Sequence, residues 1–195
     1  MSTHPRLKLF AVALFVTMLA CQALTPASKP TAADIEREEQ AVYSFFVHAG
    51  AGPAVLLQET ATNISQDDPG QTIQYVRDGL KNISRETLDN YLERNNNPGE
   101  LSPDMDLGVE YVLLNAEERR RIFSQPEGWR VFNETYPGSG GYTELSRVGF
   151  NDTFDQALIY VGQMAGDLMG AGFYYLLEKK GGEWLLMEQI MVWIS

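Results

Sequence analysis

The stretch Gly172-Phe-Tyr-Tyr-Leu-Leu-Glu-Lys-Lys-Gly-Gly-Glu-Trp-Leu-Leu-Met-Glu-Gln-Ile-Met-Val-Trp-Ile194 decides the fold class of this chain. Two apolar and aromatic runs flank Lys180-Gly-Gly182, and a glycine pair between two such runs is typical of a β-hairpin. Because successive side chains of a strand point to opposite faces, the second run has apolar residues on both faces. Such a strand is either central and covered on both sides, or it faces a partner.

Turn signals upstream extend this hairpin to an antiparallel meander. Asn151-Asp152 and a longer link from Gly162 to Gly170 separate the apolar runs. We therefore predict four strands, over Tyr142–Phe150, Gln156–Val161, Gly172–Lys179 and Glu183–Ile194.

The residues before the meander follow helical patterns, interrupted by two short strands. Thr31, Ser84 and Asn115 are placed to cap the first, third and fourth of these helices. We predict helices over 31–47, 73–80, 84–95, 116–123 and 128–136, and strands over 54–60 and 109–114. The expected fold is α+β, with N-terminal helices packed on a C-terminal antiparallel meander. A cone-shaped sheet with a ligand cavity, as in NTF2-like proteins, is one form of this architecture, by analogy only.

The N-terminus has the layout of an export signal. Arg6 and Lys8 precede an apolar run that ends at Ala20, and this run is shorter than the about 20 residues that span a bilayer. A polar segment with two prolines follows. We predict an export signal over 1–20, a tether over 21–31 and a single α+β domain over 32–195.

Cys21 is the predicted site of lipid attachment. The run Met18-Leu-Ala-Cys21 resembles the bacterial lipobox in having Ala before Cys, and departs from it in having Met18 where Leu is usual. The expected location is the outer face of a bacterial membrane, to which the lipid anchors the protein. Ordinary secretion is the alternative.

The charge of the chain restricts its partners. It has 26 acidic and 15 basic residues, a formal net charge of −11, and cleavage before Cys21 would remove Arg6 and Lys8. A chain this acidic is repelled by nucleic acid and by anionic headgroups. The expected partners are a cationic protein or a small ligand, and the membrane only through the lipid.

Few residue types suited to catalysis are present. One cysteine excludes an intramolecular disulfide, and His4 and His48 are the only histidines, so a histidine-rich metal site is excluded. We expect no catalytic residue, metal or cofactor.

Three residues of the predicted strands are candidates for a binding site or an ion pair. Glu188 lies among apolar residues of the last strand, where a carboxylate is costly unless it is paired. Arg147 on the first meander strand is its expected partner. Glu144 is a second acid that could join Glu188 in general acid/base chemistry, which in glycosidases needs two carboxylates about 5–10 Å apart.

Three segments carry a resemblance to a family of exported bacterial (lipo)proteins of uncharacterised function: Ser146-Arg-Val-Gly-Phe-Asn151, Ala157-Leu-Ile-Tyr-Val-Gly162, and Gly170-Ala-Gly-Phe-Tyr-Tyr-Leu-Leu-Glu-Lys-Lys180 with Trp184 and the closing Trp193-Ile-Ser195. The resemblance implies a bacterial, envelope-associated protein and brings no activity with it.

The sequence thus favours a non-enzymatic cell-envelope lipoprotein that binds a partner protein or a small ligand. Two alternatives stay open: an envelope hydrolase that uses carboxylates of the sheet, and an acidic inhibitor of a basic envelope enzyme.

Overall fold

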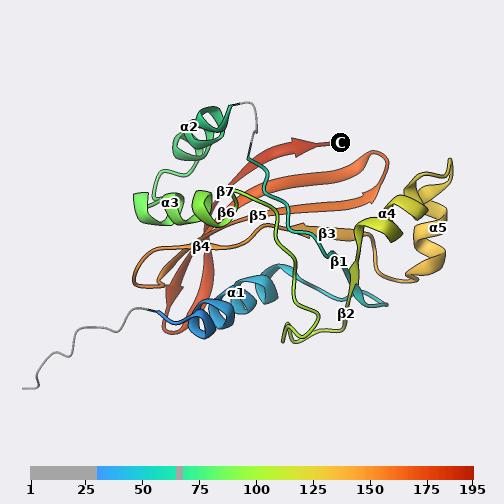
Figure 1. The fold of residues 1–195 in the computed structure, drawn as a ribbon, viewed down its shortest axis with the longest axis horizontal. Coiled ribbons are helices and arrows are strands. Elements are labelled where there is room, and N and C mark those ends of the chain that lie inside the picture. Colours follow the sequence, from blue (N-terminus) through green and yellow to red (C-terminus); the bar gives the residue numbers. More distant parts are fainter. Residues whose placement is uncertain (1–29, 65–67) are drawn as a thin grey trace, which may run out of the picture. The chain divides into compact units, whose positions relative to one another are not determined.

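A seven-stranded mixed sheet organises the chain, as Figure 1 shows. The computed structural model describes residues 30–64 and 68–195, so the predicted export signal and Cys21 lie outside the described residues. The strands are β1 (Ala54–Leu57), β2 (Tyr111–Leu114), β3 (Tyr142–Leu145), β4 (Gly149–Phe150), β5 (Gln156–Gly166), β6 (Met169–Lys180) and β7 (Glu183–Ile194). Their order across the sheet is β2-β1-β3-β5-β6-β7, and β4 pairs with β5.

The C-terminal strands form the predicted antiparallel meander, but the single strand predicted over Tyr142–Phe150 is wrong. It is broken into β3 and β4, because the Arg147 backbone between them bonds to the Asn95 side chain instead of a strand. β3, β5, β6 and β7 pair antiparallel in sequence, and the 180–183 turn joins the last two. At the other side of the sheet, β1 runs parallel to both β2 and β3. The predicted α+β fold is confirmed, with an open and mixed sheet.

The long link predicted from Gly162 to Gly170 is wrong. Both strands continue through these glycines, β5 to Gly166 and β6 from Met169. The reason lies in the space beside these glycines: a Cβ on Gly172 would clash with the Trp193 indole of β7, and a Cβ on Gly170 would clash with the Met164 sulfur of β5. These two glycines therefore make room for neighbouring side chains rather than for a loop.

The last strand, predicted to be central or to face a partner, is an edge strand. β7 pairs with β6 alone among the described strands. Exposed apolar side chains lie on both of its faces, since the neighbouring residues Leu185 and Leu186 point to opposite faces and are both exposed.

In the described part of the chain five helices accompany the sheet, close to the predicted ranges: α1 (Ala32–Phe46), α2 (Pro69–Gly79), α3 (Arg85–Arg94), α4 (Ala116–Phe123) and α5 (Gly128–Thr135). The three predicted N-caps are confirmed, since the side chains of Thr31, Ser84 and Asn115 each accept a backbone N–H of the first turn. Thr31 also forms a capping box with Asp34.

Alternating side chains of β5 divide the core between the two faces of the sheet. Ile159 and Val161 pack with α1 residues such as Val42 on one face. Leu158 and Tyr160 pack on the other face with residues of α2 and α3. Farther along that second face, α4 and α5 cover the ends of β1, β2 and β3. Within residues 30–64 and 68–195, no helix is long and apolar enough to cross a membrane.

Candidate functional site

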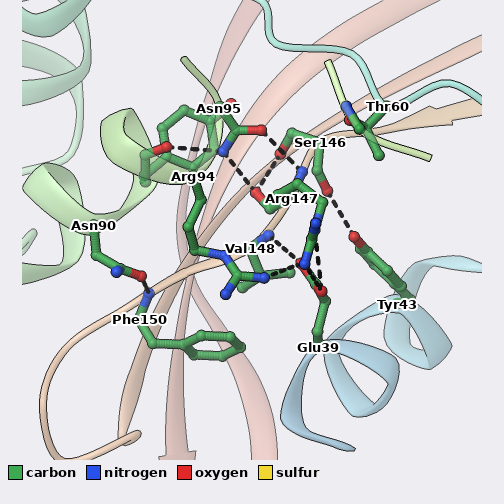
Figure 2. Close-up of polar contacts among 12 residues, drawn as sticks. Glu39, Tyr43, Thr60, Asn90, Arg94, Asn95, Ser146, Arg147, Val148 and Phe150 are labelled. Carbon is green, nitrogen blue, oxygen red and sulfur yellow. Dashed lines mark hydrogen bonds and ion pairs between the residues drawn. The ribbon is translucent and has the colours of Figure 1, made fainter. Parts of the chain in front are cut away.

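Glu39 of α1 is a buried carboxylate that accepts hydrogen bonds from side chains and backbone of other elements, as Figure 2 shows. Arg147 donates to it through Nε, at 3.0 and 3.2 Å from the two carboxylate oxygens, and through Nη2 at 2.9 Å. Arg94 of α3 adds a bond from Nη2 at 2.8 Å, and the backbone N–H of Val148 another at 2.8 Å. Both carboxylate oxygens are therefore fully engaged, as a buried charge requires.

A second layer of hydrogen bonds fixes the segment that carries Arg147 (Figure 2). The Asn95 side chain accepts from the Arg147 N–H at 2.9 Å and donates to the Arg147 carbonyl at 2.9 Å. Tyr43, one turn after Glu39, donates its hydroxyl to the Ser146 carbonyl at 3.0 Å. The cluster thus joins α1, α3 and the β3–β4 connection.

The guanidinium groups control the ionisation of Glu39. Burial alone would raise the pKa of its carboxyl, but the Arg147 hydrogen bonds, the charges of Arg94 and Arg147 and the Val148 N–H outweigh burial and lower this pKa. Glu39 is therefore ionised at neutral pH, and it has no lone pair left to accept a proton from a substrate.

A pocket of about 360 Å³ opens beside this cluster, with Arg94 and Arg147 in its wall. Glu36 and Glu100 also line it, so acids and guanidinium groups are mixed around the opening. Neither positive nor negative charge dominates the wall of this pocket. The ion cluster beside it joins α1, α3 and the β3–β4 connection.

Glu188, one of the predicted site residues, does not contact Arg147. Its carboxylate accepts the backbone N–H groups of Lys81, at 2.6 Å, and Asn82, at 3.2 Å, and also the Asn82 side-chain amide. These donors belong to the connection between α2 and α3. The predicted Arg147–Glu188 pair is therefore wrong, because each residue has a nearer partner from the helical half of the chain.

Glu144 lies on the same face of the sheet as Glu188, next to Gly162 of β5. Arg119 of α4 is 3.7 Å from its carboxylate, a distance that gives attraction without a hydrogen bond. Burial raises the pKa of Glu144, and the charge of Arg119 only partly opposes this shift.

The register places Glu144 and Glu188 far apart. Glu144 is opposite Gly162, which pairs with Gly172, whereas Glu188 pairs with Leu176. Three inter-strand spacings and the offset along β6 separate the two residues by roughly 20 Å. A two-carboxylate mechanism needs a separation of about 5–10 Å, so these acids do not form such a pair.

β7 has more exposed large apolar side chains than any other described strand. Leu185, Leu186, Met187, Met191 and Ile194 are each between 42 and 72 % exposed. At the opposite edge of the sheet, Val112 of β2 is the one large apolar residue exposed, at 37 %. One edge of the described sheet is therefore markedly more apolar than the other.

The sequence did not reveal the central role of Glu39. A signal was present, because Glu39 lies at helical spacing from Val42, Tyr43 and Phe46 and so takes a position in the buried stripe of α1. An acid in such a stripe needs a partner from another element. Arg147 was predicted to pair with Glu188, and it pairs with Glu39 instead.

No protein-family model, no curated protein and no solved structure matches this chain.

Proposed function

We propose that this protein is a non-enzymatic binding protein of the bacterial cell envelope, anchored by lipid at Cys21, that binds a partner protein along β7. The observation that carries the proposal is the exposed apolar edge of the sheet. Backbone groups on the outer side of an edge strand can pair with an extended segment of another chain, and exposed side chains of the edge then give specificity.

β7 lacks the charged residues that usually protect an edge. Between Trp184 and Ser195 the sequence contains no Lys, Arg or Pro, and Glu188 is its only charged residue. The Glu188 carboxylate accepts the backbone N–H groups of Lys81 and Asn82, so its charge does not protect the unpaired edge of β7 from pairing with another chain. An edge of this composition is unusual for a surface that meets only water.

Two bulges define which part of the edge is suited to pairing. The register with β6 skips Met187 and Val192, which leaves Glu188–Met191 as the regular stretch between them. Tyr75 of α2 donates its hydroxyl to the Met191 carbonyl and covers that end. The bulges make long edge-to-edge stacking unfavourable, so a short extended segment with apolar side chains fits best.

The net charge indicates the chemistry of the rest of the partner. A chain with a net charge of −11 attracts cationic surfaces and repels a second copy of itself. The proposed partner is therefore a protein with an apolar extended segment and basic surroundings.

Two matched lysine substitutions test this proposal. Met187→Lys places a charge on the β7 edge, and Val112→Lys places one on the opposite edge strand, at a similarly exposed position. Tagged full-length proteins are captured from their own membranes at low and high salt, and the bound fraction is identified by mass spectrometry.

The proposal predicts one stoichiometric, basic partner with wild type and with Val112→Lys, lost with Met187→Lys and weakened by salt. Retention of the same partner by Met187→Lys would overturn the β7 assignment. A protein that is captured without a partner, or only with a second copy of itself, would overturn the proposed function.

A further inference from the structure

A pocket of about 410 Å³ lies near the edge of the sheet opposite to β7, where β1 and β2 end. Leu57 and Leu114, the last residues of these parallel strands, pair in register, so both carboxyl ends meet at this point. The helix α4 begins directly after β2 and borders the pocket, as Figure 1 shows for the helix. In open sheets of parallel strands, ligands bind in the crevice beyond the carboxyl ends, and small-molecule sites have volumes of about 300–1,000 Å³.

The inner side of this pocket is apolar. Leu57 and Leu114 are buried there, and the half-buried Phe123 of α4 also lines it. The Phe123 ring is held by an edge contact with the Trp129 ring, with 5.0 Å between the two centroids. The apolar surface is therefore built into the fold, and a ligand with a hydrocarbon part is suited to it.

The outer side of the pocket has two guanidinium groups. Arg119 and Arg120 of α4 both line the pocket and are both exposed, so a ligand can reach them. Arg119 lies 5.5 Å from the centroid of the Tyr142 ring and 3.7 Å from the Glu144 carboxylate, which is too far for a hydrogen bond to that acid. No acid of the described residues forms an ion pair with Arg120. Because a guanidinium has five N–H donors, both groups have donors left for a ligand.

The charge of this lining is opposite to that of the chain. Glu59 is the only acid of the lining and is itself exposed, whereas the chain has 26 acidic and 15 basic residues. Guanidinium groups bind carboxylates through paired hydrogen bonds, so the lining favours an anionic group at the mouth of the pocket. The net charge of −11 repels ligands with many negative charges, which favours a single one.

We infer that this pocket binds a small carboxylic acid with a compact hydrocarbon body, either aromatic or branched aliphatic. The carboxylate accepts N–H donors of Arg119 and Arg120, and the hydrocarbon body lies along the apolar inner side of the pocket. A neutral ligand would make no use of the two charges, and a bare anion would leave the apolar side empty. The pocket and β7 belong to opposite ends of the strand order, so this inference does not depend on a partner protein along β7.

Titration of the purified full-length protein with four compounds, followed by calorimetry and saturation-transfer NMR, tests both halves of the inference. Phenylacetate and isocaproate have the charge and the hydrocarbon body, phenylacetamide has the body alone, and acetate has the charge alone. We expect at least one of the two larger acids to bind about tenfold more tightly than phenylacetamide and acetate. Binding of only one of them identifies the body as aromatic or aliphatic. Failure of both to bind, or equal binding of phenylacetamide or acetate, would overturn the inference.

Arg120→Gln and Arg121→Gln form a matched pair of variants. Both remove one positive charge from neighbouring exposed positions of α4, but Arg121 is outside the lining and pairs with Glu118 at 3.2 Å. We expect affinity for the preferred acid to fall about tenfold in Arg120→Gln and to stay at the wild-type value in Arg121→Gln. Both variants should keep the melting temperature of wild type, because both positions are on the surface.

Two results with these variants would overturn the inference. An equal loss of affinity in both would show that the ligand responds only to the net charge of the protein. Unchanged affinity in Arg120→Gln would show that this guanidinium does not contact the carboxylate.

Discussion

Arg147 Nη2 lies 2.9 Å from Glu39 Oε2, although 108 residues separate the two in the chain. This contact, with the Arg94 contact to the same carboxylate, joins the first helix and α3 to the connection between β3 and β4. Glu39 has 8 % of its side chain exposed, so solvent screens these interactions little. The position of α1 on the sheet therefore depends on an ion cluster as well as on apolar packing.

Glu39→Gln is expected to destabilise the fold strongly. The substitution leaves two guanidinium groups in a largely buried place without their counter-charge, and breaking a buried ion pair from one side costs about 3–5 kcal/mol. Urea denaturation measures the change in the free energy of unfolding.

Glu36→Gln, on the exposed side of the same helix, is the matched control and should stay within about 0.5 kcal/mol of wild type. A Glu39→Gln protein as stable as this control would show that the cluster contributes nothing to the fold.

The same cluster predicts an acid dependence of stability. Because the folded-state pKa of Glu39 is below the ordinary value of 4.5, the unfolded chain binds its proton more readily than the folded chain does. The contribution of Glu39 is fully present above pH 4.5 and is lost as the pH falls through the lowered folded-state pKa.

Urea denaturation at a series of pH values shows whether the stability contributed by Glu39 falls in acid. The difference in unfolding free energy between wild type and Glu39→Gln should be largest near neutral pH and should shrink in acid. A difference that grows as the pH falls would contradict the assignment.

The contribution of Glu144 to stability should depend on pH in the opposite direction. Its folded-state pKa is raised by burial, so its contribution to stability is greatest below 4.5 and is lost as the pH rises through the raised folded-state pKa. Glu144→Gln removes this penalty and is expected to be slightly more stable than wild type at neutral pH and not in acid.

Thermal unfolding at pH 4 and pH 7 compares the two proteins. If Glu144→Gln is less stable than wild type at pH 7, attraction to Arg119 dominates over burial, and the explanation given for the shift is wrong.

Gly172→Ala is expected to disturb the end of the sheet. Its Cβ would clash with the Trp193 indole and approach the Tyr160 hydroxyl, which accepts the indole N–H at 2.7 Å. Overpacking of this kind costs about 1–3 kcal/mol. Gly166→Ala, in the same hairpin, would meet only the flexible Met169 side chain at 3.4 Å and is the control.

Denaturation of the two alanine variants decides the question. Equal stability of both would mean that the indole can move away without cost, and the glycines of β6 would then need another explanation.

Local signals in the sequence predicted most elements of the fold. Caps such as Ser84 and Asn115 act within one helical turn, and the Gly181-Gly182 turn acts between neighbouring strands, so a sequence window contains all of their partners. The end of β5 was missed because a segment with glycines at 162 and 166 is typical of a loop. Gly162 pairs with Gly172, whose missing Cβ leaves space for the indole of Trp193, and Trp193 is distant in the sequence.

The candidate site was harder to predict, because ion pairs between distant elements leave no periodic signal. Glu188 was predicted to pair with Arg147, whereas its carboxylate accepts two backbone N–H groups of the α2–α3 connection. Backbone donors are present at every residue except proline, so the sequence does not distinguish the ones that will be free.

Hydrogen–deuterium exchange of the β7 backbone tests whether a partner protein binds along this strand. Peptides that cover Glu183–Ser195 are followed in the purified full-length protein and in the complex captured from membranes, with β2 peptides as the internal reference. If a partner binds along β7, the outward-facing β7 amides exchange fast in the free protein and are strongly protected in the complex, with β2 unchanged. Equal exchange of β7 in the two states would contradict it.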